Sequence, residues 1–538
     1  MARKIAIFWP GDYRAKPNEL ALPGATEASR QLEAALRKLG CESYRVEGWL
    51  TRPHEAIDRL GRIDDPLIGV CTHWFYGPHT TDGVVGKDNP LLLASNFSGQ
   101  WPGLVGLLNT GACLESVGRD FSRIWTAAAD WSADERFMAL LDEWVRTGWI
   151  EYLSEPIRSL PRMAAAGATA PRPQNGADAI ARQDRPLAGP TPARQVYDGI
   201  RQRRILALML GDTSMGMING YFGPRLLNPI GFTEHKIDQA WIIHRGQGVA
   251  ESRIDAALDF VKQNGVAFHY RERDAADFDE NATREQLRDY LAVLDMVREF
   301  KADCLGWQYQ LGLLPLRPPS DFAEGLFNSA CRPESTGEPF MTATEGDQGA
   351  LVPMELMKRL LKAKGLHPAV MFHDVRWGGE HDGRFVWVLL NSGSCGAYAF
   401  NHDPETLRGA HSYRQPAGYF PVPGGTFAGE SLPGKITWAR AWIHTERQTA
   451  PSARCSSELC MDIGRGEVVK LPEQKRDAWW EGTTRQWPFM AADLGVSQEC
   501  VMAHYMSNHI CVAYGDIRDE LAALCQSLGV AVRLWGGE

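Results

Sequence analysis

"KIAIFW" (residues 4–9) is a short apolar run bounded by charge and by Pro10, and it predicts a β-strand. Residues 25–39 then show the spacing of an amphipathic helix that ends at Gly40, and "PLIGVCTHW" (66–74) predicts a second buried strand. The apolar segment "PGLVGLLNTG" (102–111) follows. Short apolar strands separated by amphipathic helices predict a parallel sheet covered by helices.

A change in composition marks the first predicted domain boundary. Residues 161–193 contain no aromatic residue, and about half of them are Pro or Ala, which is typical of a linker or an exposed insertion. A second α/β unit begins with "RILALML" (204–210) and continues with helical stretches at 251–264 and 283–300. We therefore expect an N-terminal α/β domain at 1–160, the linker at 161–193 and a second α/β domain at 194–345.

The last third of the sequence has a different pattern. "AVMFHDVRW", "RFVWVLLNSG" and "KITWARAWIH" predict strands joined by turns, which favours a mainly antiparallel sheet or barrel over residues 346–538. "HICVAYGD" and "IRDELAALCQSLG" add a final strand and helix. The predicted class is α/β, with two Rossmann-like α/β domains followed by a β-rich, barrel-like domain.

Bulk composition excludes several classes of function. The formal net charge of −9 over 538 residues argues against a surface for nucleic acid or anionic membrane. No apolar run reaches the length of a membrane-spanning helix, and the N-terminal apolar run before Pro10 is too short for a signal peptide. The eleven Cys residues lack CxxC spacing, so we expect neither a disulfide framework nor a zinc knuckle. We expect a cytoplasmic location, because reduced cysteines are typical of the cytosol.

Two carboxylates and no base stand in "MTATEGDQGALVPM" (341–354). The segment predicts a strand edge, a tight turn at Gly346 and a helix over 349–362. Either Thr344 or Asp347 can cap that helix, and the helix dipole can stabilise the negative charge of Glu345 near the N-terminus of the helix. The alternative is that Glu345 has a functional role in an active site or metal site.

Two further segments carry polar groups at strand ends. In "VMFHDVRW", Phe372 and Asp374 share one face of the predicted strand, and burying Asp374 requires a cation, either a metal ion or Arg376. In "AHYMSNHICVAYGD", His504 and His509 are five residues apart, which does not suit two ligands on one helix face. A single His is often simply a core residue. Together, two carboxylates and one imidazole would suit Mn²⁺ or Mg²⁺ better than zinc.

The same segments, in this order, resemble the L-fucose isomerase family: "FNSACRPESTGEPFMTATEGDQGAL", "FHDVRW", "LLNSGS" and "SNHICVAYGDIRDELAALCQSLGVAV". Phosphate loops, dinucleotide fingerprints, nucleophile elbows and HExxH motifs are absent from the sequence. The resemblance implies that Glu345, Asp374 and His509 bind a metal ion, and that Glu345 and Asp374 also move protons.

The resemblance extends weakly to substrate contacts elsewhere in the chain. It suggests Arg14 in "GDYR", Trp74 in "CTHWFYG", Gln310 (or Gln308) in "GWQYQ", Tyr419 in "AGYFPVPGGTF", Trp487 in "RQWPFM" and Asn508 beside the ligand His. "SMGM" (214–217) matches a segment of the middle domain. The Trp is expected to reach the site of a neighbouring subunit, in a homo-oligomer (a hexamer or trimer) whose sites lie at subunit interfaces.

The activity that the resemblance implies is aldose–ketose isomerisation of an open-chain sugar through an ene-diolate, with Mn²⁺ (or Mg²⁺ or Co²⁺) as cofactor. Three alternatives stay open: an isomerase of an anionic or sulfonated hexose, with Arg14 as a candidate contact; a non-catalytic sugar-binding protein; and a metal-independent glycoside hydrolase that uses the two carboxylates.

Overall fold

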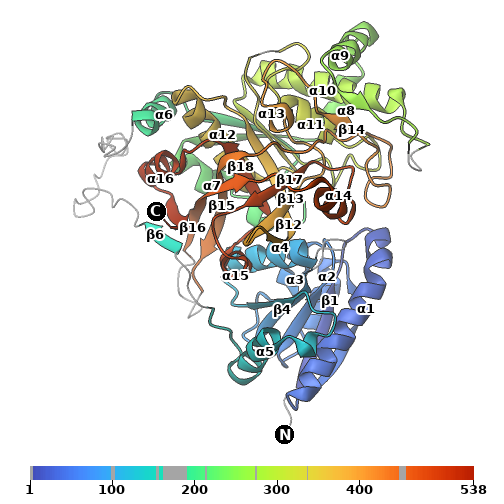
Figure 1. The fold of residues 1–538 in the computed structure, drawn as a ribbon, viewed down its shortest axis with the longest axis vertical. Helices are drawn as coiled ribbons and strands as arrows, with labels where there is room; N and C mark the ends of the chain where they lie inside the picture. The colour runs from blue at the N-terminus through green and yellow to red at the C-terminus, as the bar shows by residue number, and fades with distance from the viewer. Residues whose placement is uncertain are drawn as a thin grey trace.

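The computed structural model describes residues 4–97, 103–152, 157–160, 191–212, 215–272, 276–335, 337–447 and 456–537. These residues form a mixed α/β protein with two parallel sheets and one mixed sheet. In Figure 1 the blue and cyan N-terminal lobe lies below the rest of the chain, with the N-terminus at its tip.

The first sheet has five parallel strands in the order β2-β1-β3-β4-β5. Its strands are β1 (Lys4–Pro10), β2 (Glu42–Leu50), β3 (Leu67–Cys71), β4 (Leu91–Asn96) and β5 (Ser122–Thr126). Its helices are α1 (Ala15–Lys38), α2 (Pro53–Leu60), α3 (Gly77–Val84), α4 (Gly103–Ser116) and α5 (Glu135–Thr147). This alternation confirms the parallel, helix-covered sheet that the sequence predicts.

Two helices of this lobe differ from the sequence pattern. Helix α1 begins ten residues before the predicted start at residue 25, because Pro17 falls in the first turn, where the missing N–H has no helical partner anyway. Pro23 lies on the exposed face of the helix. The apolar segment at 102–111 lies largely within helix α4, which is buried along its first twelve residues and therefore shows no amphipathic period.

The second sheet has four parallel strands in the order β11-β10-β7-β8. Its strands are β7 (Ile205–Leu210), β8 (Phe232–Ile237), β10 (Cys304–Trp307) and β11 (Thr342–Thr344). The helices around it are α6 (Thr191–Gln202), α7 (Gly223–Leu227), α8 (Ala240–Gly246), α9 (Glu251–Gln263), α10 (Glu280–Phe300), α11 (Asp321–Phe327) and α12 (Gln348–Ala363). The predicted helices at 251–264 and 283–300 correspond to α9 and α10, the second beginning three residues earlier.

The third sheet has eight strands in the order β15-β18-β12-β13-β17-β16-β19-β6, and β15 also pairs with β16. Its strands are β6 (Ile157–Leu160), β12 (Val370–His381), β13 (Arg384–Leu390), β15 (Gly434–Thr445), β16 (Ser457–Val468), β17 (Phe489–Asp493), β18 (His509–Tyr514) and β19 (Ala531–Trp535). All its pairs are antiparallel except β16 with β19. The sheet is therefore mixed, and the barrel stays a prediction.

Short elements complete this region: helices α13 (Tyr398–Asn401), α14 (Glu473–Glu481), α15 (Gln498–His504) and α16 (Arg518–Ser527), and a small sheet of β9 (Ala267–Phe268) with β14 (His411–Ser412). Most of the predicted linker, 161–190, lies outside the described residues, and its last three residues begin helix α6. Strand β6, just before it, pairs with β19 of the third sheet rather than with the N-terminal sheet.

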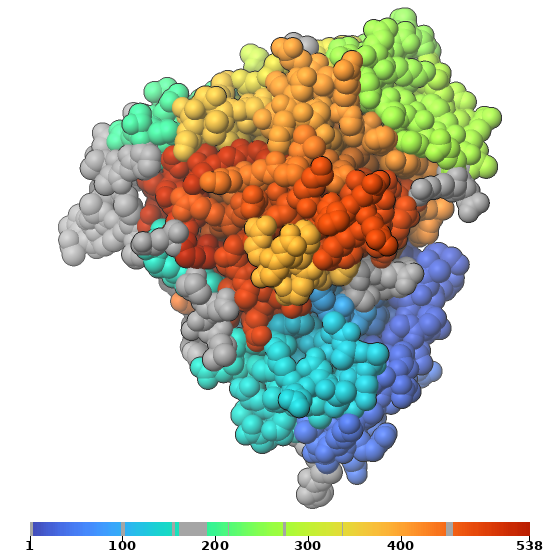
Figure 2. Space-filling view, in the orientation of Figure 1, coloured from blue at the N-terminus to red at the C-terminus, as the bar shows by residue number. Residues whose placement is uncertain are grey.

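The lobes pack against each other through charged as well as apolar contacts. Arg123 of β5 is fully buried and donates to the backbone oxygen of Tyr505, and His444 of β15 contacts Glu115 of α4 over 2.5 Å. Figure 2 shows the N-terminal lobe directly beneath the C-terminal residues on this face of the molecule. In the part of the chain that the structure describes, no helix combines the length and the apolar character needed to cross a membrane.

Candidate active site

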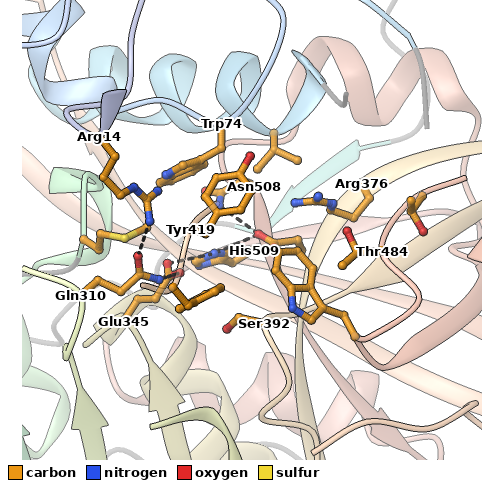
Figure 3. A pocket seen from close by; sticks show the side chains of 16 residues that line it. Arg14, Trp74, Gln310, Glu345, Arg376, Ser392, Tyr419, Thr484, Asn508 and His509 are labelled. Atoms are coloured by element: carbon orange, nitrogen blue, oxygen red, sulfur yellow. Dashed lines mark hydrogen bonds and ion pairs between the residues drawn. The ribbon is translucent and has the colours of Figure 1, made fainter. Parts of the chain in front are cut away.

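A cavity of about 290 Å³ lies where the carboxyl ends of both parallel sheets meet the third sheet. Open parallel sheets bind ligands at this edge because the loops that follow the strands converge there. The cavity is lined by Arg14, Trp74, Val105, Met215, Gln310, Glu345, Asp374, Arg376, Ser392, Tyr419, Phe420, Thr483, Thr484, Trp487, Asn508 and His509 (Figure 3). The structure thus brings together all nine site residues that the sequence predicts, although their roles stay predictions.

The N-terminal lobe contributes Arg14 and Trp74 from the loops after β1 and β3. The guanidinium of Arg14 pairs with the buried carboxylate of Asp12 at 2.6 Å and lies over the ring of Tyr419, 5.1 Å from its centroid. Burial would lower the pKa of Arg14, but the charge of Asp12 raises it above its ordinary value. Trp74 lines the cavity of its own chain.

The loop after β10 resolves the choice between two glutamines. Gln310 lines the cavity, where its Nε2 donates to Oε1 of Glu345 over 2.9 Å and its Oε1 accepts from Arg14 over 3.3 Å. Gln308 instead accepts from Gln239 over 2.6 Å and does not line the cavity. Gln310 is therefore the glutamine placed to contact a ligand.

Glu345 follows strand β11 in a backbone conformation that non-glycine residues rarely adopt. Its φ is 60°, and Gly346 after it has a φ of 66°. Such left-handed residues cost free energy and cluster at functional sites. The turn places the carboxylate in the cavity, where Oε2 is buried and has no hydrogen-bond partner among the described residues.

Asp374 and His509 lie side by side on neighbouring strands of the third sheet. They are register partners on the antiparallel strands β12 and β18. Nε2 of His509 lies 3.1 Å from Oδ1 of Asp374 and 3.7 Å from Oε2 of Glu345. Asn508 donates to Asp374 over 3.2 Å. The other candidate imidazole, His504, ends helix α15 and is not among the residues that line the cavity.

A buried ion pair lies directly behind His509. Asp347, one of the two caps that the sequence allows, caps helix α12 by accepting from the backbone N of Ala350. Its other oxygen accepts from Nδ1 of His509 over 2.7 Å. Nη1 of Arg440, in β15, donates to that same oxygen, and both charged side chains are fully buried. The sequence pattern indicates the cap but not the link to Arg440.

Burial and neighbouring charges shift the pKa values of three buried side chains, Glu345, His509 and Asp347. Burial, with the nearby charge of Asp374, raises the pKa of Glu345 to about 8. Burial would lower the pKa of His509, yet the charges of Asp374 and Asp347 raise it to about 9. Burial would raise the pKa of Asp347, yet Arg440 and His509 lower it to about 2. The carboxylates of Glu345 and Asp374 thus share the imidazole of His509 as a close neighbour.

The trio Glu345, Asp374 and His509 fits a divalent cation in chemistry and in proximity. Ligands at right angles, each about 2.1 Å from a metal ion, lie about 3.0 Å apart, close to the 3.1 Å and 3.7 Å between donor atoms. Of these atoms, Oε2 of Glu345 has no hydrogen-bond partner among the described residues and is free to act as a ligand. Among the described residues, no group of three His, Cys, Asp or Glu side chains is arranged so that it could hold a metal ion as it stands, so metal binding by this trio would require the side chains to rotate.

The wall of the cavity opposite Gln310 and Glu345 carries an aromatic ring and hydroxyl groups. Trp487 lies here, with Arg376 over its ring at 5.2 Å. The sequence suggests Arg376 as a partner of Asp374, but the structure has no ion pair between these two described residues. Thr483 and Thr484 also line this wall. No motif in the sequence identifies the two Thr residues.

Comparison with known families supports the resemblance seen in the sequence. Residues 389–536, about a quarter of the chain, match the family model described as L-fucose isomerase, C-terminal domain. This segment includes Tyr419, Trp487, Asn508 and His509, while Glu345 and Asp374 lie before it. No curated protein sequence matches the chain. The family match implies a sugar isomerase.

Proposed function

The chain resembles the L-fucose isomerase family through residues 389–536, and from that premise we propose that it is a metal-dependent aldose–ketose isomerase acting on an open-chain sugar through an ene-diolate. The observation that carries the proposal is the meeting of Glu345, Asp374 and His509 around one point of a single cavity. Glu345 follows β11, Asp374 lies within β12 and His509 begins β18, and only the folded chain brings them together.

The proposed cofactor is Mn²⁺, with Mg²⁺ or Co²⁺ as alternatives, held by Glu345, Asp374 and His509. Two carboxylates and one imidazole, which would lose its second ring proton when the ion binds, match the ligands that such ions prefer. When bound, the ion supplies Lewis-acid polarisation of the sugar carbonyl. The raised pKa of Glu345 supports the assignment, because a carboxylate that burial holds partly protonated gains most from an adjacent cation.

In the proposed reaction, Glu345 and Asp374 transfer a proton between C1 and C2 of the sugar. One carboxylate would remove the proton from C2, next to the carbonyl, and a carboxyl would return a proton to C1, a general acid–base role. The proton of the C2 hydroxyl would pass to the oxygen on C1, so that the carbonyl moves from C1 to C2. Gln310 donates to Glu345 and Asn508 donates to Asp374. These hydrogen bonds orient the two carboxylates toward the cavity.

The remaining predicted residues would hold the sugar chain. Trp74, Tyr419 and Trp487 offer apolar walls, while Arg14, Gln310 and Asn508 offer hydrogen bonds to hydroxyls. Nε1 of Trp74 and Oδ1 of Asn508 are buried without a hydrogen-bond partner among the described residues. A site with such free polar atoms favours a polyhydroxylated ligand, because an unpaired buried donor or acceptor is costly.

The proposed assembly is a homo-oligomer, a trimer or hexamer, in the cytoplasm. Trp74 lines the cavity of its own chain, so its expected reach into a neighbouring site would require a second conformation or a different packing of the N-terminal lobe. Sedimentation analysis of the purified protein measures the assembly directly.

The test is isomerisation of a panel of aldoses by protein loaded with Mn²⁺, with products followed by NMR. Treatment with EDTA should abolish turnover and added Mn²⁺ should restore it. Glu345→Gln should abolish turnover while leaving the unfolding transition in place. A metal-independent glycoside hydrolase would survive EDTA, and a sugar-binding protein would bind aldoses without converting them, so each alternative gives a different result.

A further inference from the structure

The cavity contains two guanidinium groups, and only one has a counter-charge. Arg14 pairs with Asp12 at 2.6 Å and also donates to Gln310. Arg376 has no ion pair with any carboxylate in the described parts of the chain, and its Nε is buried without a hydrogen-bond partner there. Arg376 is half-buried, and a guanidinium that is partly removed from water gains free energy from an anionic partner.

The position of Arg376 separates it from the carboxylates of the proposed reaction. It follows Asp374 by two residues on β12, but the register of β12 against β13 shifts between Val375 and Trp377. Figure 3 shows its side chain beside Thr484, on the other side of the cavity from Gln310 and Glu345. Its guanidinium lies 5.2 Å from the ring centroid of Trp487.

A sum of formal charges around the cavity leaves Arg376 unbalanced. Asp12 balances Arg14, and Arg440 balances Asp347. A divalent cation bound as proposed would balance Glu345 and Asp374. The positive charge of Arg376 is then the surplus, and a ligand with one negative charge would complete the balance.

We propose that Arg376, with the hydroxyls of Thr483 and Thr484, forms an anion subsite, and that the substrate is an open-chain aldose whose end remote from the carbonyl carries an anionic group. Carboxylate, sulfonate and phosphate share the required chemistry, since guanidinium binds their paired oxygens through two parallel hydrogen bonds. This inference rests on the proposed isomerase function. It assigns the anion contact to Arg376 rather than to Arg14, whose charge Asp12 already neutralises.

The experiment compares matched aldoses with Mn²⁺-loaded protein: glucose as the neutral member, glucuronate, 6-sulfoquinovose and glucose 6-phosphate as the anionic ones. We expect kcat/KM for at least one anionic aldose to exceed that for glucose by at least about tenfold, as one charge-assisted hydrogen bond provides. Arg376→Gln should remove that preference, and Arg376→Lys should retain part of it. Arg384→Gln, which removes an exposed guanidinium outside the cavity, should leave it unchanged.

A second readout needs no turnover. Inorganic sulfate should raise the midpoint of thermal unfolding of the wild-type protein and of Arg384→Gln by more than that of Arg376→Gln, which should keep only the general stabilisation that sulfate gives to folded proteins. Equal loss of neutral and anionic turnover in Arg376→Gln, or identical sulfate stabilisation in that variant, would overturn the subsite. If no aldose is converted while sulfate still binds through Arg376, the isomerase proposal fails and the anion subsite stands.

Discussion

Asp347 accepts a hydrogen bond from Nδ1 of His509 over 2.7 Å, which leaves Nε2 of the same ring facing Asp374 and Glu345. A histidine that binds metal through one nitrogen commonly donates from the other to a carboxylate, which fixes both the tautomer and the ring orientation. Asp347 is in turn held by Arg440, so a buried ion pair supports the imidazole from behind.

Asp347→Asn should weaken Mn²⁺ binding by about 10- to 100-fold, because the amide oxygen is a poorer acceptor for the imidazole N–H. The substitution also leaves Arg440 as a buried charge without its counter-ion, so the free energy of unfolding should fall by about 3–5 kcal/mol. Titration of Mn²⁺ by electron paramagnetic resonance measures the first effect, and denaturant unfolding measures the second.

Asp462→Asn is the matched control for Asp347→Asn. Asp462 is also fully buried and pairs with Arg533 at 2.6 Å, but neither residue lines the cavity. This variant should lose stability and keep its Mn²⁺ affinity. Equal loss of metal affinity in both variants would mean that Asp347 acts only through stability.

Gly349→Ala should disturb the ion pair between Asp347 and Arg440 through steric overlap alone. A Cβ at this position would lie 2.5 Å from Nη2 of Arg440 and 2.8 Å from the backbone oxygen of Ala441. Overpacking of this kind costs about 1–3 kcal/mol, and we also expect reduced Mn²⁺ affinity as Arg440 shifts. Gly199→Ala in helix α6 meets no atom within 4 Å, so it should be neutral or stabilising by up to about 1 kcal/mol. Thermal unfolding compares the two variants.

The strands and helices that the sequence predicts are those with a clear period. Helix α9 buries one face and helix α10 does so over its first half, and their predicted bounds differ from the structure by at most three residues. Helix α4 is buried on nearly every side, so its sequence carries no period that separates it from a strand. The pairing of β6 with β19 joins segments more than 370 residues apart, and no local pattern reports it.

The candidate site likewise contains residues that the sequence identifies and a residue that only the structure identifies. Glu345, Asp374 and His509 are recognisable because each stands in a distinctive motif. The predicted strand end is wrong for Asp374, which lies inside β12 because this strand continues to His381. Arg440 lies in the middle of an apolar strand, and its partner Asp347 is 93 residues away. Only the tertiary structure shows that a buried charge there has a counter-ion.

Gln415→Leu should loosen the aromatic wall of the cavity. Oε1 of Gln415 accepts from Nε1 of Trp487 over 2.8 Å, and its Nε2 donates to the fully buried carboxylate of Asp321 over 2.8 Å. Removing both bonds frees the indole and leaves Asp321 short of a donor. We expect KM for the sugar to rise about tenfold, with a smaller change in kcat and altered Trp fluorescence.

The control for this change is another buried glutamine. Gln286 donates to the backbone oxygens of Pro319 and Gly425 and does not line the cavity. Each lost bond to a buried group costs about 1–3 kcal/mol, so Gln286→Leu should lose stability and keep the wild-type KM. An unchanged KM in Gln415→Leu would mean that Trp487 is held by packing rather than by the amide.

His73→Gln should change how stability depends on pH. His73 is fully buried; Asn18 Oδ1 lies 3.0 Å from its Nε2 and also accepts from the backbone N of Asp12, beside Arg14. Burial lowers the pKa of His73 to about 4, from 6.5 in the unfolded chain. The stabilisation is therefore complete above pH 6.5 and is lost as pH falls toward 4, by about 3 kcal/mol at most. Urea unfolding at several pH values should show a shallower slope in His73→Gln over that window, whereas parallel slopes for variant and wild type would contradict the assignment of this acid sensitivity to His73.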